Sequence, residues 1–168
     1  MKTLQISRIK PNPTGKDRSR YGVATPSQLG AEWVDIQNVG GASVILDGVE
    51  LNHIAYSGPE KKPTWEAVCK LTGSLGASQI LRVHSGEQRP LLVLNAEDLA
   101  GADWHGFTGR DQYVWNNREG DTPALWDFLQ SHWIDRASYS PNPPEGVVLV
   151  RVGDALIVPI PVAAYSRR

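Results

Sequence analysis

The chain is poor in sulfur: its 168 residues include one cysteine, Cys69, and one methionine. A single cysteine excludes a disulfide framework within the chain and is compatible with a reducing compartment. Long hydrophobic runs are also lacking, since no apolar stretch approaches the roughly 20 residues that a membrane helix needs. Residues 1–8 do not contain the apolar segment of a secretory signal. We therefore expect no membrane contact and, if the chain is full length, a cytoplasmic location.

An excess of charge of either sign is lacking as well. The net charge is −1 and the sequence pI is about 6.4. Non-specific nucleic-acid binding depends on neutralising phosphates, so a nucleic-acid partner is not expected. Lys10, Lys16, Arg18 and Arg20 could form a local basic patch, although a solvated N-terminal loop is the favoured interpretation. Hydrophobic residues make up 40% and charged residues 21%, which is typical of a globular protein. Residues 1–168 are expected to form one domain.

Glycine and proline interrupt the chain at short intervals, and β-branched residues cluster between them, which favours many short strands. In residues 32–38, Val34 and Ile36 alternate with Asp35, so that one face is apolar and the other polar. The predicted fold is an all-β antiparallel sandwich of about seven to ten strands. Strands are expected over residues 4–9, 32–38, 43–46, 49–56, 79–85, 91–95, 113–115, 124–128, 133–140, 147–152 and 155–160, the last two forming a hairpin.

Helical structure is expected in few places. A helical turn is predicted over residues 95–100. Trp65, Val68 and Leu71 fall three apart, which fits a helix over Thr64–Leu71, with a strand as the alternative. Residues 16–29 are polar and contain glycine, so they are predicted to be a loop, and Asp47-Gly48 is expected to connect two strands as a tight turn.

Six phrases, in this order, resemble the lamin-tail domain family, in the form found in bacterial members. They are Leu4–Ile9, Glu32–Asn38, Leu46–Leu51, Leu81–Gly86, Trp115–Thr122 and Ile134–Tyr139. The resemblance implies an immunoglobulin-like β-sandwich that serves as a binding or scaffolding module. It covers a family-like core of about residues 4–140, so that the hairpin of residues 145–161 is an extension.

The chain departs from the family pattern in three places. Val49 stands where the third phrase usually has tryptophan, a long loop insertion separates Gly86 from Tyr113, and the C-terminal hairpin is additional. No heptad stretch is present, so the filament-forming rod of lamins is absent. Roles in chromatin or at the nuclear envelope are therefore not carried over.

The residue types used for catalysis do not form a recognisable motif, so no enzyme activity, cofactor or metal is expected. The four histidines lack metal-ligand spacing, and His84 is expected to fix neighbouring loops by a hydrogen bond. Cys69 is expected to be a small buried hydrophobe. Calcium bound by loop carboxylates at the rim of the sandwich stays an open alternative. The histidines are His53, His84, His105 and His132.

Six tryptophans are the most suggestive feature for binding. Trp33, Trp115 and Trp133 lie in predicted strands and are expected in the core. The insertion carries Trp104, His105, Phe107 and Arg110, and aromatic and arginine side chains are enriched at interface hot spots. These four are the predicted ligand- or partner-binding residues, although the insertion could equally cap one end of the sandwich.

We therefore expect a non-enzymatic protein-interaction or scaffolding module, which binds another protein or associates with itself. The tryptophan count supports an alternative, a carbohydrate- or small-ligand-binding module. Nucleic-acid binding is the least favoured alternative, because of the near-neutral charge.

Overall fold

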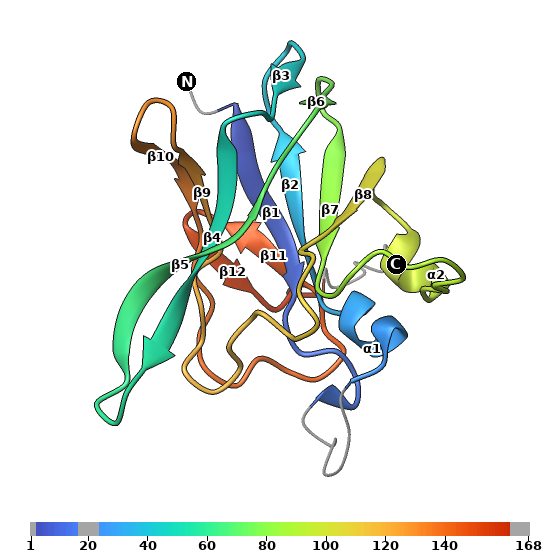
Figure 1. The fold of residues 1–168 in the computed structure, drawn as a ribbon, viewed down its shortest axis with the longest axis vertical. Coiled ribbons are helices and arrows are strands. Elements are labelled where there is room, and N and C mark those ends of the chain that lie inside the picture. Colours follow the sequence, from blue (N-terminus) through green and yellow to red (C-terminus); the bar gives the residue numbers. More distant parts are fainter. Residues whose placement is uncertain (1–2, 17–23, 162–168) are drawn as a thin grey trace, which may run out of the picture.

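A computed structural model describes residues 3–16 and 24–161 of the chain. Strands account for 43% and helices for 7%, so the protein is all-β, as predicted. Two main sheets face each other across a hydrophobic core (Figure 1). The two helices of the described residues, α1 (Pro26–Gly30) and α2 (Ala96–Leu99), are short, and neither is long and apolar enough to cross a membrane.

The larger sheet has six strands in the order β12-β11-β1-β2-β7-β8. Neighbouring strands are antiparallel, except that β8 lies parallel to β7. The first strand of the chain therefore pairs with β2 on one side and with β11, near the end of the chain, on the other. The strands are β1 (Leu4–Lys10), β2 (Trp33–Asn38), β7 (Ile80–His84), β8 (Trp104–Phe107), β11 (Leu149–Val152) and β12 (Ala155–Ile157).

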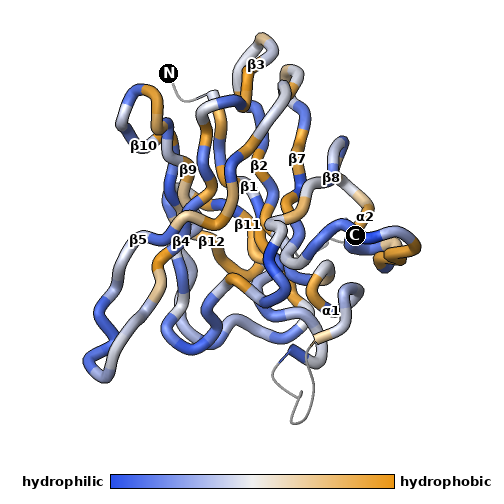
Figure 2. The backbone as a smooth tube through the Cα atoms, in the orientation of Figure 1, coloured by the Kyte–Doolittle hydropathy of each residue, from blue (hydrophilic) through white to orange (hydrophobic). Residues whose placement is uncertain are grey.

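The second sheet has four antiparallel strands in the order β10-β9-β4-β5, and a two-stranded sheet pairs β3 with β6. The long β4–β5 hairpin projects away from the body, and its tip is hydrophilic (Figure 2). These strands are β3 (Val44–Ile45), β4 (Val49–Ser57), β5 (Lys62–Lys70), β6 (Ser74–Leu75), β9 (Ala124–Asp127) and β10 (His132–Arg136).

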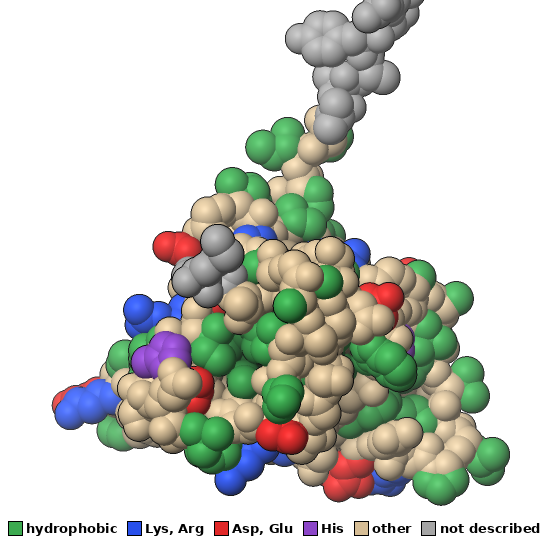
Figure 3. All heavy atoms as spheres, turned by 90° about the horizontal axis from the view of Figure 1, so that it is seen from above, with side chains coloured by type: hydrophobic (Ala, Val, Ile, Leu, Met, Phe, Trp, Pro, Cys, Tyr) green, Lys and Arg blue, Asp and Glu red, His purple; other side chains and the backbone are tan. Residues whose placement is uncertain are grey.

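The core lies between the two main sheets. Val34 and Ile36 of β2 meet Leu51 of β4 and Leu125 of β9, and all four are fully buried. The alternation predicted for β2 is confirmed, because Asp35 lies on the opposite face of its sheet. Burial of such aliphatic side chains stabilises the fold by about 1.5–3 kcal/mol each. Figure 3 views the end of the molecule near β3 and β6, where hydrophobic side chains lie in separate groups among polar ones.

The two sides of the sandwich differ. On one side, β12 is joined to the segment after β10: the Ser138 N–H donates to the Asp154 carbonyl (3.0 Å), and the Leu156 N–H donates to the Ser138 carbonyl (2.8 Å). Arg151 of β11 also forms an ion pair with buried Asp135 of β10 (2.7 Å). On the other side, β8 and β5 are edge strands of different sheets and are not paired with each other. We call these the closed side and the open side.

The predicted helix over Thr64–Leu71 is wrong, because the segment belongs to strand β5. Residues three apart lie on opposite faces of a strand, because its period is two. Val68 is therefore buried and Trp65 exposed. A β-bulge follows at Val68, where the register shifts between the pairs Asn52–Ala67 and Leu51–Cys69.

Several smaller predictions also fail. The loop predicted over residues 16–29 contains α1, which Thr25 caps by accepting from the Gln28 N–H, while residues 17–23 lie outside the described residues. Residues 91–95 and 113–115 are not strands. The strand before Asp47-Gly48 pairs with β6 instead of β4, so no hairpin forms at that turn. The described residues form twelve strands, more than the seven to ten predicted. The short strands β6 and β8 were not expected, and β5 had been predicted as a helix with a strand as the alternative.

The helical turn near residues 95–100 and the C-terminal hairpin are confirmed as α2 and as β11–β12. The expectation for the tryptophans is partly wrong. Trp33 and Trp115 are each 2% exposed, but Trp133 lies on the outer face of the four-stranded sheet, opposite Trp126. Its strand was predicted correctly; the face was not.

Candidate functional site

The segment between Gly86 and Tyr113, expected to be a loop insertion, supplies an edge strand. Trp104 pairs with Leu81 and Phe107 pairs with His84, in parallel. Asp103 sets this register in two ways: its N–H donates to the Ile80 carbonyl (2.9 Å), and its carboxylate accepts from the Ile80 N–H (2.8 Å). The segment is therefore part of the larger sheet.

Helix α2 anchors the same segment to the outer face of the larger sheet. The buried Asp98 carboxylate accepts from the Trp33 indole (2.8 Å) and from the Lys10 ammonium (2.7 Å). Arg82 donates to the carbonyls of Asp98 and Ala100 (2.9 Å each). Lys10 is thus part of an internal ion pair, and Lys16 likewise binds buried Glu32.

The ion pairs of Lys10 and Lys16 argue against the basic patch that was considered from the sequence. The other two members of that patch, Arg18 and Arg20, lie outside the described residues. The charges of Lys10 and Lys16 are matched by internal carboxylates, so they are not presented to a polyanion. Burial raises the pKa of Glu32, and the Lys16 ammonium opposes this rise.

A buried ion pair lies beneath α2. Arg82 contacts Asp35 through two hydrogen bonds (2.7 and 2.9 Å), and Arg8 contacts the same carboxylate (2.7 Å). The Arg82 guanidinium also lies 3.5 Å from the centre of the Trp33 ring. Two-point arginine–carboxylate contacts fix geometry as well as charge, so this ion pair holds β1, β2 and β7 in register.

Two histidines connect β7 to β8. The Nδ1 of buried His84 lies 2.6 Å from the Gly30 carbonyl, which can only accept, so this nitrogen carries the proton. Its Nε2 therefore accepts from His105 Nδ1 at 2.9 Å. Burial lowers the pKa of His84 to about 4, and neighbouring His105 and Arg82 add to this effect. Burial also lowers the pKa of His105.

The His84 pKa predicts a loss of stability in mild acid. In the unfolded state the His84 imidazole is protonated near pH 6.5, whereas in the folded state its pKa is about 4. The stability that is present above pH 6.5 is therefore lost as the pH falls. The His84 contribution between pH 7 and pH 5 is about 2 kcal/mol. Urea unfolding at both pH values should show that His84→Asn loses less stability on acidification than the parent, by about this amount.

The control for this experiment is His132→Asn, at an exposed position of β10. It should keep the pH dependence of the parent. Glu32 titrates in parent and variants alike, so it cancels from the comparison. If His84→Asn loses as much stability between pH 7 and pH 5 as the parent does, His84 is not the source of the acid sensitivity.

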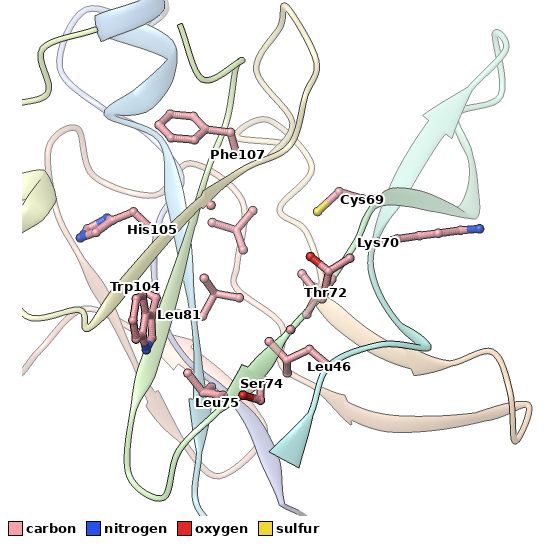
Figure 4. A pocket seen from close by; sticks show the side chains of 14 residues that line it. Leu46, Cys69, Lys70, Thr72, Ser74, Leu75, Leu81, Trp104, His105 and Phe107 are labelled. Atoms are coloured by element: carbon pink, nitrogen blue, oxygen red, sulfur yellow. The ribbon is translucent and has the colours of Figure 1, made fainter. Parts of the chain in front are cut away.

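The open side of the sandwich contains a pocket of about 530 Å³. Its volume is in the range of small-ligand sites. Figure 4 shows Trp104 on one wall, Cys69 and Thr72 on the opposite wall, and leucine side chains between them. The lining residues form an apolar interior and a polar rim. The interior includes Leu46, Leu71, Leu75, Leu81 and Val83, and the rim includes Lys70, Thr72 and Ser74.

Cys69 behaves as the small hydrophobe expected from the sequence. It packs against the core cluster and lines the pocket. Burial raises the pKa of its thiol to about 11, so the thiol is protonated at neutral pH. Since the thiolate is the reactive form of cysteine, the geometry gives Cys69 a packing role.

The structure separates the predicted binding residues. Trp104, His105 and Phe107 all border the pocket, but the rings of His105 and Phe107 stack on His84 on the outer face of the sheet. Trp104, which is 56% exposed, is the predicted side chain on the pocket side (Figure 4). Arg110 lies elsewhere on the open side, where its guanidinium donates to the Ala67 carbonyl and to Glu66 (2.7 Å). Arg110 thus links the segment after β8 to β5, and its hydrogen bond lowers the pKa of Glu66.

Sequence reasoning missed half of this pocket. Residues 69–75 form its second wall, but they were interpreted as a helix end followed by a turn. The alternating apolar residues Leu71 and Leu75 were the available signal, since both are buried. Among the described residues, no three His, Cys, Asp or Glu side chains gather as a group that could hold a metal ion.

No protein-family model matches the chain, and no curated protein matches it. The function is therefore argued from the geometry of the molecule and from the resemblance carried by its six sequence phrases.

Proposed function

We propose that this chain is a non-enzymatic interaction module that binds an extended segment of a partner protein on its open side. The bound segment pairs with edge strand β8 and inserts an apolar side chain into the neighbouring pocket. The observation that carries this proposal is the coincidence of an edge strand, an exposed tryptophan and an apolar pocket between the two sheets.

Strand β8 can accept a further strand. The N–H of Thr108 donates to the His84 carbonyl of β7 (2.9 Å), and alternate residues of a strand point the same way, so the N–H groups of His105 and Phe107 point outward. Unpaired main-chain groups at a sheet edge are a template for strand addition. The closed side offers no such edge between the sheets, because Ser138 joins them there.

The pocket supplies selectivity. Its interior is formed by leucine and valine side chains, which favour an aliphatic group because apolar area is removed from water. Gly106 borders the pocket without a side chain of its own, and a Cβ added there would meet Leu81 at an ordinary 3.7 Å. The expected ligand is therefore a strand with an aliphatic residue facing this wall.

We also propose that the module belongs to the lamin-tail type, with an immunoglobulin-like topology. Five of the six phrases overlap strands, namely β1, β2, β4, β7 and β10, which supports the proposal. The asparagine-rich phrase of residues 115–122 forms a loop built around Asp121, whose carboxylate accepts from Ile54 N–H at 2.9 Å. The cytoplasmic location stays a prediction, as does the absence of enzyme activity.

A selection experiment tests the proposed function. A phage-displayed library of random dodecapeptides is selected on the immobilised protein, and the affinities of enriched peptides are measured by fluorescence anisotropy. We expect peptides with alternating apolar residues. Trp104→Ala should weaken them about thirtyfold, as for a hot-spot residue. Phe107→Pro should bind them about fivefold more weakly than Phe107→Ala does, because one outward-facing N–H donor is lost.

Two matched controls accompany the selection. Phe107→Ala removes the same ring but keeps the N–H, and Trp65→Ala alters an exposed indole on the other sheet. Failure to enrich any peptide, or peptides that ignore both Trp104→Ala and the change from Phe107→Ala to Phe107→Pro, would falsify the proposal. Sedimentation velocity at several concentrations distinguishes self-association, which would identify the partner as a second copy of this chain.

A further inference from the structure

Three tryptophans form a cluster on the outer face of the four-stranded sheet. The rings of Trp65 and Trp133 are 4.5 Å apart and tilted by 44°, and those of Trp126 and Trp133 are 4.7 Å apart and tilted by 66°. They come from three strands, β5, β9 and β10. Trp65 is 42% exposed, so part of its flat indole is open to solvent while the Trp133 ring packs against it.

Small residues let these rings meet across the sheet. Ala124 of β9, Asn52 of β4 and Ala67 of β5 lie in one cross-strand row on the face that carries the tryptophans. Beside the cluster lies a groove of about 460 Å³, which Trp65 and Trp133 line. An indole that neighbouring rings hold in place loses little conformational entropy on binding. This small cost favours the binding of ligands that make few contacts.

Polar groups border this groove on the closed side. The hydroxyls of Thr122 and Ser138 form an exposed hydrogen bond of 2.8 Å, and each hydroxyl has further donor or acceptor capacity. The Asp154 carboxylate is 87% exposed at its side chain and is held by Arg151 at 3.0 Å. Arg136 completes the rim. The groove thus combines an aromatic floor with hydroxyl, carboxylate and guanidinium groups.

We propose that this groove binds carbohydrate, with a sugar ring stacked on Trp65 and its hydroxyls bonded to Thr122, Ser138 and Asp154. A sugar has an apolar C–H face and a rim of hydroxyls, which matches these two kinds of surface. The β8 pocket differs in having aliphatic walls. The site is independent of the peptide site, because it lies on another sheet.

A cationic ligand fits this cluster less well. Aromatic cages for quaternary ammonium groups need rings spaced around a central volume. Here the three indoles are in contact with one another, and the Arg136 guanidinium already lies 5.7 Å from the centre of the Trp133 ring. The exposed face of Trp65 is therefore suited to stacking.

The test uses three defined probes: cellohexaose, chitohexaose and laminarihexaose. Each is titrated into the full chain while tryptophan fluorescence and the heat of binding are followed. At least one should bind with a Kd of about 0.1–1 mM, typical of a single stacked ring with few hydrogen bonds. Trp65→Ala should weaken that probe at least tenfold, and Asp154→Ala should weaken it about threefold.

Trp104→Ala is the matched control, since it removes an exposed indole from the other sheet. It should leave sugar binding unchanged, and thermal unfolding should show that all variants are folded. The proposal fails if none of the three probes binds at concentrations of about 10 mM, or if Trp65→Ala and Trp104→Ala behave alike. If selected peptides lose affinity in Trp65→Ala and the sugars do not bind, the cluster belongs to a protein partner instead.

Discussion

Replacing Asp35 by alanine is expected to lower the free energy of unfolding by about 3–5 kcal/mol. The substitution leaves Arg82, whose side chain is 1% exposed, without its carboxylate partner, and it also releases Arg8. An unpaired buried charge is far costlier than the pair was stabilising, because desolvation is no longer compensated. Since domains are stable by only about 5–15 kcal/mol, a large share of the stability should be lost. Urea unfolding followed by tryptophan fluorescence measures the change.

An exposed ion pair supplies the comparison. Glu60 and Lys62 lie 3.4 Å apart near the tip of the β4–β5 hairpin, with side chains 75% and 76% exposed. Exposed pairs contribute about 0–1 kcal/mol, so Lys62→Ala should change stability little. A loss below about 1 kcal/mol in Asp35→Ala means that Arg82 finds water or another partner, and that the ion pair does not hold the sheet.

Asp121→Ala should lower the melting temperature by about 6–12 °C. The buried carboxylate accepts from the N–H groups of Ile54 (2.9 Å), Asn116 (3.1 Å) and Thr122 (2.7 Å), and from His53 Nδ1 (2.9 Å). Removing it leaves several donors without a partner, at about 1–3 kcal/mol for each one that stays buried. A net loss of about 3 kcal/mol corresponds to this shift in Tm for a domain of this size.

Asp127→Ala is the matched control, because its carboxylate also accepts from two N–H groups, those of Leu129 and Gln130, but in an exposed turn. Water can replace it there, so we expect a small effect. Differential scanning calorimetry of both variants provides the comparison. Equal melting temperatures for the two variants contradict the central role of Asp121.

The strands were the predictable part of this molecule. The alternation of Val34, Asp35 and Ile36 indicates directly which side chains face the core, because the period of a strand is two. It could not predict which groups cover the polar face. Asp35 was expected on the polar face of its strand, and it is fully buried there, because helix α2 covers it and Arg82, 47 residues away in the chain, neutralises it.

The candidate sites were less predictable, because each joins residues that are distant in sequence. Trp104 was identified from its composition and surroundings, but its pocket depends on residues 69–75 across the open side. Predicting the tryptophan cluster requires knowing which face of the four-stranded sheet each indole occupies. A bulge between Trp133 and Asp135 shifts the register of β10, and no pattern in the sequence announces such a shift. Trp133 was therefore assigned to the core.

The pairing of β1 with β11 determines when the protein can finish folding. Strand β1 leaves the ribosome before the other strands of its sheet, but its partner β11 begins only at Leu149. Until β11 is made, one edge of β1 has no strand beside it, and Asp135, which accepts from the Ile6 N–H, lacks its ion pair with Arg151. The larger sheet therefore closes only after β11 has been synthesised, and the long-range pairing makes closure slow. Until then, nascent chains of this protein carry an unprotected strand edge, which makes them prone to aggregation.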